Sequence, residues 1–249
     1  EYKDLHKLLL SSRGLLGRKK INKIIEFGCG TGWLTNSIAY YYKRNLTSVD
    51  FTHKAIKIAE AVSQRLGLNP TFYLSDIFDF NIDNKYDLVI SLGVLHHTSD
   101  CRKAFNKISK FVNKNGYLYL GLYHLYGRRP MLQFLQSHAR WHGEESSFNL
   151  FRKMNKSMDE KSHSYSWFRD QVLHPHETQH TYRELVEWVN SIGFKVVSTS
   201  INNYNDLSKT NDDDLYIKEK ELEQYSYDKN INKLIFNPGY FTLCAQRII

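Results

Sequence analysis

The stretch that decides the fold reads Ile24-Ile25-Glu26-Phe27-Gly28-Cys29-Gly30-Thr31-Gly32-Trp33. Its apolar start predicts a buried β-strand, and its three alternating glycines predict a tight loop that leads into a helix. Glycine suits such a loop because it has no side chain to keep a ligand away and because it accepts positive φ angles. A dinucleotide fingerprint would need Gly or Ala at position 33, where this chain has Trp. The stretch therefore indicates a nucleotide-binding loop of another kind.

Acidic residues end the strands that are predicted after this loop. Residues 46–50 form a β-rich run that ends in Asp50, and residues 71–76 form another that ends in Asp76. A carboxylate about 20 residues after the glycines can accept hydrogen bonds from ribose hydroxyls. Such alternation predicts an α/β fold with right-handed crossovers, a parallel sheet and ligands at the carboxyl ends of the strands. The further predicted elements are helices at 34–42, 53–66 and 102–112, and strands at 86–92 and 117–123.

The order of these motifs resembles that of the class I S-adenosylmethionine-dependent methyltransferases, over about residues 21 to 123. The resemblance implies a doubly wound, Rossmann-like sheet of seven mostly parallel strands, with a late strand after Gly193 and an antiparallel last strand at 240–247. It implies that S-adenosylmethionine (SAM) is the cofactor and S-adenosylhomocysteine the product. The residues that it assigns to the cofactor are Glu26, Gly28, Cys29, Gly30, Thr31, Gly32, Asp50, Phe51, Asp76, Ile77, Ser91 and His96.

Within that set the resemblance also implies separate roles. The three glycines would line the methionine part of the cofactor, and Asp50 would hold its ribose hydroxyls. The adenine would then contact Phe51, Asp76 and Ile77.

The chain of 249 residues is expected to form one domain, residues 1–249, with two insertions. Residues 124–180 are too many for a loop between the fifth strand and a helix at 183–190, so we expect a substrate cap there. A second excursion at 201–239 precedes the last strand. In it, we expect a solvated turn at 211–214 and a helix at 216–227.

The expected cap is rich in histidine, aromatic and cationic side chains, and it contains seven of the chain's eleven histidines. Arginine can bind a carboxylate or phosphate through two hydrogen bonds, and aromatic rings provide apolar walls. We therefore expect SAM-dependent methylation of an O or N atom of a small polar molecule. The candidate acceptor-binding residues are Tyr123, Arg128, Trp167 and Arg169.

A hydroxyl or ammonium acceptor needs a base as the methyl group arrives, and a neutral imidazole suits that role near pH 7. The candidate catalytic residues are His97, His124, and His176 oriented by Glu177. A helix N-cap is predicted at Thr181, with Glu184 completing a capping box.

The segment just before that N-cap has two further interpretations. Its His174, His176, Glu177 and His180 are acceptable metal ligands, or they form a loop held by side-chain hydrogen bonds. Their spacing matches no known metal signature and methyl transfer from a sulfonium needs no metal, so no metal is expected.

The charge of the chain does not exclude functions other than small-molecule methylation. The net charge is +8, and the basic excess lies in the first 123 residues, notably Arg18, Lys19, Lys20, Lys23, Lys103, Lys107 and Lys110. A solvated helix face explains this spacing, and an RNA-binding surface is the alternative. An RNA (tRNA base) methyltransferase and a non-catalytic SAM-binding partner domain therefore remain alternatives to the small-molecule enzyme.

Two features concern location. The longest apolar run, residues 88–95, is far shorter than the roughly 20 residues of a membrane helix, so no membrane partner is expected. Three scattered cysteines, Cys29, Cys101 and Cys244, and the lack of a secretory pattern predict the cytoplasm. The chain begins with Glu1 rather than Met, which indicates that a short N-terminal piece precedes it.

Overall fold

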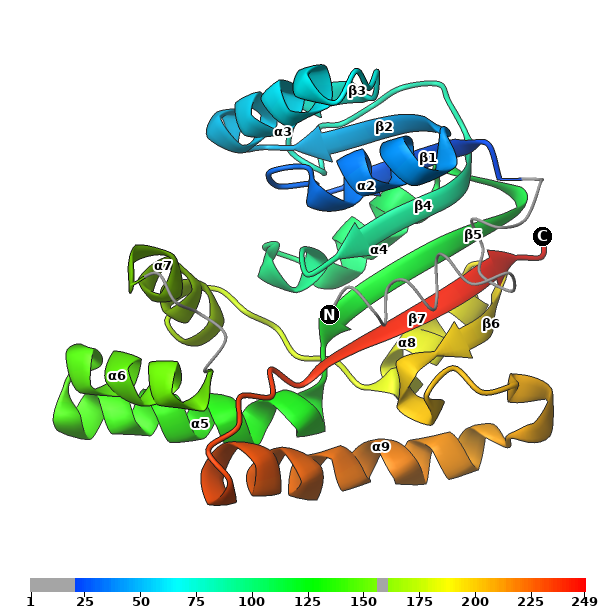
Figure 1. Cartoon of the computed structure of the whole chain (residues 1–249). Coiled ribbons are helices and arrows are strands. Elements are labelled where there is room, and N and C mark those ends of the chain that lie inside the picture. Colours follow the sequence, from blue (N-terminus) through cyan, green and yellow to red (C-terminus); the bar gives the residue numbers. More distant parts are fainter. Residues whose placement is uncertain (1–20, 156–160) are drawn as a thin grey trace.

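The computed structural model describes residues 21–155 and 161–249. Its seven-stranded sheet has the order β3-β2-β1-β4-β5-β7-β6 (Figure 1). Strand β7 pairs antiparallel with β5 and β6, whereas the pairings among β1 to β5 are parallel. These findings confirm the predicted fold class. The strands are β1 (Lys23–Phe27), β2 (Asn45–Asp50), β3 (Thr71–Leu74), β4 (Tyr86–Leu92), β5 (Val112–Tyr123), β6 (Phe194–Thr199) and β7 (Tyr240–Arg247).

Helices cover both faces of the sheet. Successive side chains of a strand point to opposite faces, and the apolar side chains of β1 pack against helices on each of them. On one face, Ile24 packs with Leu34 and Ile38 of α2. On the other face, Ile25 and Phe27 pack with side chains of α4 and α8. The helices that connect or flank the strands are α2 (Trp33–Tyr42), α3 (His53–Arg65), α4 (Cys101–Ser109) and α8 (Tyr182–Ser191).

Two predicted boundaries are wrong. The helix that was expected to reach Val112 ends at Ser109, because Val112 pairs with Tyr86 and begins β5. The expected solvated turn at 211–214 is instead the start of α9 (Asp212–Tyr227), for which Asn211 is the N-cap. Negative charge is favourable at a helix N-terminus, which explains why three aspartates occupy the first turn of α9.

The residues after β5 form three helices, α5 (Leu125–His142), α6 (Glu144–Met154) and α7 (Lys161–Val172). Their apolar side chains pack in a cluster of their own, separate from the clusters on the two faces of the sheet. Phe236, from the segment before β7, packs against the same cluster. Figure 1 shows the three helices beside the sheet, at the end where β5 finishes. We call them the insertion helices.

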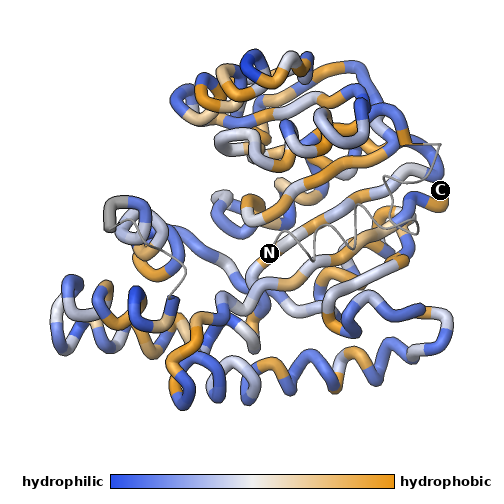
Figure 2. The backbone as a smooth tube through the Cα atoms, viewed as in Figure 1, coloured by the Kyte–Doolittle hydropathy of each residue, from blue (hydrophilic) through white to orange (hydrophobic). Residues whose placement is uncertain are grey.

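The second excursion contains α9 and short helical elements around it. Figure 1 shows α9 running along α5, and hydrophilic positions predominate along α9 in Figure 2, whereas hydrophobic positions follow the strands. Three short elements, η4 (Ser200–Asn202), η5 (Leu207–Lys209) and η6 (Asp228–Asn232), belong to this excursion, whereas η3 (Leu95–His97) follows β4. No helix in the described part of the chain combines the length and the apolar character needed to cross a membrane.

Candidate functional site

The three glycines of the loop after β1 differ in their surroundings. All three have positive φ angles, of 75° at Gly28, 52° at Gly30 and 79° at Gly32. A Cβ at Gly28 would collide with Val94, and one at Gly32 would come within 2.6 Å of Ala59. A Cβ at Gly30 would meet no described atom within 4 Å. The loop is thus packed at its two ends and leaves room for a ligand at its centre.

The end of β2 lies against this loop. Oδ2 of Asp50 accepts a hydrogen bond from the Gly30 amide at 2.8 Å, and Oδ1 accepts one from the Thr52 amide at 2.8 Å. The Gly28 amide donates to the carbonyl of Val49 at 2.7 Å. Beside Asp50, the ring of Phe51 is 76% exposed. The open centre at Gly30, an adjacent carboxylate and an uncovered ring fit a nucleotide cofactor.

Glu26 lies beneath the loop as a buried acid. Its side chain is 4% exposed and accepts a hydrogen bond from the Thr35 hydroxyl. Burial is the main reason why the pKa of Glu26 is raised to about 7; hydrogen bonds from Thr35 oppose this rise, and the nearby charge of Asp50 adds to it. Burial likewise raises the pKa of the Cys29 thiol. Near neutral pH, a cation brought close to Glu26 would therefore stabilise its ionised form.

The structure places the other predicted cofactor residues around the same strand ends. The Asp76 carboxylate accepts a hydrogen bond from the Phe78 amide at 2.7 Å and is exposed. Thr31 is also exposed, whereas Ile77 packs in the core. The hydroxyl of Ser91 donates to the carbonyl of Phe27 at 3.3 Å. Their contacts with a cofactor stay predictions.

The His96 imidazole is buried without a hydrogen bond among the described residues. It is 0% exposed, and neither ring nitrogen has a partner among the described residues. Its ring centroid lies 4.1 Å from that of Tyr123 and 4.3 Å from that of His97. Burial holds the pKa of His96 well below its usual value, so this imidazole is neutral.

His97, the next residue, is only half-buried. Its Nδ1 lies 3.0 Å from the carbonyl oxygen of His176. Since a carbonyl can only accept, Nδ1 carries the proton and the lone pair is on Nε2. Burial lowers the pKa of His97, with the nearby charge of Asp170 opposing that effect. Neutral His97 therefore has a lone pair on Nε2 that can accept a proton, as a general base requires.

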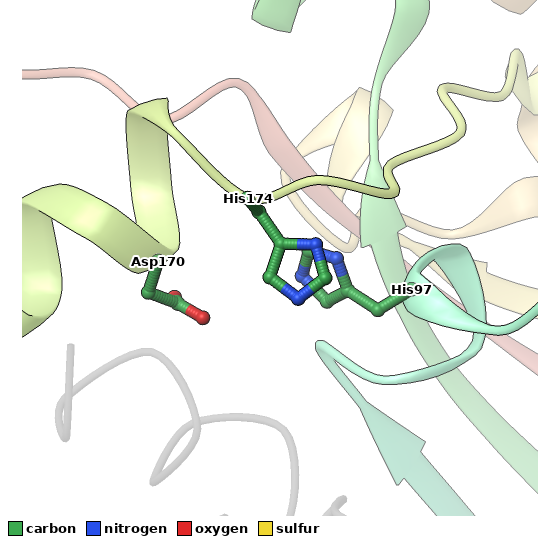
Figure 3. Close-up of side chains that lie close together, drawn as sticks. All are labelled: His97, Asp170 and His174. Atoms are coloured by element: carbon green, nitrogen blue, oxygen red, sulfur yellow. The ribbon is translucent and has the colours of Figure 1, made fainter.

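Asp170 and His174 join His97 in a group that we call the His97 trio. One nitrogen of each histidine and one carboxylate oxygen all lie within 4.8 Å of one another. Figure 3 shows the two imidazoles close together and the carboxylate pointing toward them. Sequence reasoning missed Asp170, although its spacing of four residues from His174 is a usable signal.

Arg128, a predicted acceptor anchor, has no donor left for an acceptor. The side chain is 0% exposed. Its five hydrogen bonds go to the Glu177 carboxylate, to the side chain and carbonyl of Gln171, and to the carbonyl of Pro238. The guanidinium also lies 3.6 Å from the ring centroid of Tyr123. The predicted role of Arg128 is therefore wrong, because the ion pair with Glu177 fixes it inside the protein.

His124 is also unavailable as a base. It is the N-cap of α5, where Nδ1 accepts from the Gly127 amide at 3.3 Å. Its Nε2 lies 2.9 Å from Oε2 of Glu219, which is buried with it. Both ring nitrogens are thus occupied: Nδ1 caps α5, and Nε2 links α5 to α9.

The remaining predicted residues of the insertion have mixed outcomes. Glu177 cannot orient His176, because its carboxylate binds Arg128, and the His176 side chain is exposed. Trp167 packs with Phe151 and Phe236 rather than forming an open wall. Arg169 is exposed on α7, and its role stays a prediction.

Tyr123, also predicted to bind the acceptor, is buried at the end of β5. Its hydroxyl accepts a hydrogen bond from the Gln171 side chain at 2.7 Å. Burial raises the pKa of Tyr123 to about 12, so the hydroxyl keeps its proton. An acceptor contact at Tyr123 stays a prediction.

Hydrogen bonds hold the segment between α7 and α8 against the strand ends. The amide of Thr178 donates to the backbone carbonyl of His96 at 2.8 Å, and the amide of His180 donates to the backbone carbonyl of Tyr123 at 3.0 Å. Thr181 is the N-cap of α8, as predicted, but the Glu184 carboxylate binds His180 instead of closing a capping box. The alternative interpretation, in which His174, His176, Glu177 and His180 together hold a metal, is not supported, because these four side chains form no such group.

The basic residues on α4 lie on its solvent side. Lys103 and Lys110 are exposed, whereas Ala104 and Ile108 are buried. A solvated helix face accounts for this pattern. The basic run of Arg18, Lys19 and Lys20 lies outside the described residues.

Comparison with known sequences identifies a family. The family model described as a methyltransferase domain matches residues 18–235. The malonyl-(acyl-carrier protein) O-methyltransferase of Bacillus cereus is 26% identical over 153 residues, which make up 61% of this chain and 52% of that protein. The chain thus spans about half the length of this curated relative.

Solved structures show the same fold at low sequence identity. PKMT2 from Rickettsia typhi, in complex with AdoHcy, superposes with a TM-score of 0.64 at 14% identity, over 92% of this chain and 49% of that one. The magnesium protoporphyrin IX methyltransferase from Synechocystis, with bound SAM, superposes with a TM-score of 0.51 at 15% identity, over 90% of this chain and 69% of that one.

Proposed function

The chain belongs to the methyltransferase domain family, and from that premise we propose that it transfers a methyl group from SAM to an oxygen or nitrogen atom of a small polar acceptor. The cofactor is SAM, which supplies a methyl group activated on a sulfonium when it is bound.

The relationship between Gly30 and Asp50 supports the cofactor assignment most directly. The open centre of the loop gives the backbone access to the methionine part, and the Asp50 carboxylate is placed to accept bonds from ribose hydroxyls. The carboxylate of Glu26, close beneath the loop, favours a ligand with positive charge. A pyrophosphate would be repelled by the same acid.

His97 supports the acceptor assignment. It follows β4 at the carboxyl edge of the sheet, carries its lone pair on Nε2, and has one ring nitrogen within 4.8 Å of a carboxylate oxygen of Asp170 on α7. An acceptor hydroxyl placed there would give its proton to Nε2 as its oxygen bonds to the methyl group and the bond between that group and the sulfonium sulfur breaks, whereas an ammonium would give up its proton to Nε2 before its nitrogen attacks. The Asp170 carboxylate would stabilise the imidazolium that results.

The insertion helices would form the other wall of the acceptor site. Their packed cluster and the buried Arg128–Glu177 pair give this wall a fixed shape. A wall of fixed shape suits a small molecule better than a nucleic acid. The relative from Bacillus cereus is named an O-methyltransferase, which favours oxygen as the accepting atom.

Transfer of labelled methyl groups tests this function. SAM labelled on its methyl group is incubated with the protein and a desalted or complete cell extract, which is then separated into small molecules, RNA and protein. We expect label among the small molecules of the complete extract, and clearly less label with an Asp50→Ala variant at a SAM concentration that does not saturate it. Nuclease-sensitive label would establish the RNA alternative, and no label in any fraction would favour the non-catalytic alternative.

A cytoplasmic location is part of the proposal. It is supported by Cys29 and Cys101, which are buried thiols outside any disulfide. Buried thiols that remain unpaired are typical of a reducing compartment.

A further inference from the structure

The His97 trio has the chemistry of a metal site as well as that of a base. Two imidazoles and one carboxylate are a donor set that suits zinc and neighbouring transition metals better than magnesium or calcium. The three donors come from three segments, namely η3 after β4, the last turn of α7, and the loop after α7. We propose that this trio binds one divalent transition-metal ion of the zinc class.

The hydrogen bonds around the trio are those that orient metal ligands. The Nδ1 proton of His97 is held by the carbonyl of His176 at 3.0 Å, which leaves Nε2 free to coordinate. A metal-bound histidine commonly donates its other N–H to a carbonyl in this way. The Oδ2 atom of Asp170 accepts from the Gln171 side chain at 2.9 Å, so this carboxylate is oriented as well.

The two imidazoles already face the same space. Their ring centroids are 4.0 Å apart with an interplanar angle of 39°, and Figure 3 shows the Asp170 carboxylate directed toward the two rings. Coordination through Nε2 of His174 requires its proton to move to Nδ1. That move breaks the hydrogen bond that the His176 amide donates to Nδ1 of His174. This bond is 3.2 Å long and exposed to solvent.

Partial exposure allows an ion to reach the site, since Asp170 is exposed and both histidines are half-buried. Three protein ligands leave a fourth position for water or for an oxygen of the acceptor. The ion would tie α7 to the end of β4, and it would occupy the lone pair that the proposed base uses. Zinc is therefore expected to inhibit transfer to an acceptor that needs a base.

Zinc binding tests the proposal without any cofactor or acceptor, so its outcome is separate from that of the proposed function. The metal-free, full-length protein is titrated with zinc in competition with a chromophoric chelator, and cobalt is used as a spectroscopic probe. We expect one equivalent to bind, and cobalt to give the strong visible absorption of a four-coordinate site.

Variants identify the ligands. His174→Ala and Asp170→Asn should each weaken zinc binding by at least about tenfold, while S-adenosylhomocysteine affinity, measured as a control for folding, stays unchanged. The matched control is His142→Ala, because His142 stacks on His138 at 4.7 Å elsewhere on α5. Equal zinc affinity in the wild type and in the His174 and Asp170 variants would overturn the proposal, as would binding that is lost in His142→Ala.

Discussion

The amide nitrogen of Gly30 lies 2.8 Å from Oδ2 of Asp50, 20 residues further along the chain. This contact joins the loop after β1 to the end of β2, the neighbouring strand. Because a Cβ at Gly30 would meet no described atom, the contact borders open space. The cofactor assignment depends on that arrangement.

Gly30→Ala is expected to weaken SAM binding by about 1–3 kcal/mol, because the added methyl group would enter the space of the cofactor. The matched control is Gly67→Ala, since Gly67 also has a positive φ, of 65°, and open surroundings, but lies after α3. Calorimetry should show weaker binding for the Gly30 variant alone. Equal affinities of the two variants would show that the centre of the loop does not contact the cofactor.

Asp50→Ala should weaken SAM binding by about 1–3 kcal/mol, the range for loss of a charged hydrogen-bond partner. The variant also loses the bonds to the Gly30 and Thr52 amides, so circular dichroism must first establish that it is folded. An unchanged affinity in a folded variant would remove Asp50 from the site.

The affinity for SAM should increase with pH between about 5.5 and 7, because the pKa of Glu26 is raised to about 7. A cationic cofactor lowers this pKa in the complex, so binding releases a proton, and release is favoured as the pH rises. Glu26→Gln should remove most of the dependence. If the affinity of the wild type is constant or falls over this range, the positive charge of the cofactor does not lie close to Glu26.

The cofactor half of the site could be predicted because its signals are local. The positive φ angles of Gly28, Gly30 and Gly32 and the carboxylate of Asp50 follow from one strand, one turn and a fixed spacing. The order of strands and helices predicted the sheet for the same reason.

The acceptor half could not be predicted because its partners are distant in sequence. The bonds of Arg128 to Glu177 and of His124 to Glu219 join residues 49 and 95 positions apart. No local pattern distinguishes an arginine with a buried partner from one that is free for a ligand. Asp170 was missed because it meets His97 only through the fold.

Arg128→Met should destabilise the protein by about 3–5 kcal/mol, because it leaves the buried charge of Glu177 without its partner. The adjacent Arg129 provides the matched control. It is 40% exposed and lies 3.8 Å from Glu223, so Arg129→Met should cost less than about 1 kcal/mol. Urea unfolding measures both, and similar losses would show that the buried pair does not stabilise the insertion helices.

His97→Asn should lower the rate of methyl transfer by about 10²–10⁴-fold on a hydroxyl or amine acceptor, the usual contribution of a general base. SAM affinity should stay near that of the wild type, since the cofactor contacts lie elsewhere. His176→Ala is the control, because that side chain is exposed. If His176→Ala lowers the rate and His97→Asn does not, the base has been assigned to the wrong histidine.

Calorimetric titration of the wild-type protein with S-adenosylhomocysteine, with and without NAD, tests the central claim that the Gly28–Gly32 loop holds SAM and its product. Trp33, which is 43% exposed, occupies the position where a dinucleotide loop has a small residue. We predict binding at one site per chain, with an affinity that millimolar NAD leaves unchanged. Displacement of S-adenosylhomocysteine by NAD, or no binding of S-adenosylhomocysteine to the folded protein, would contradict the account.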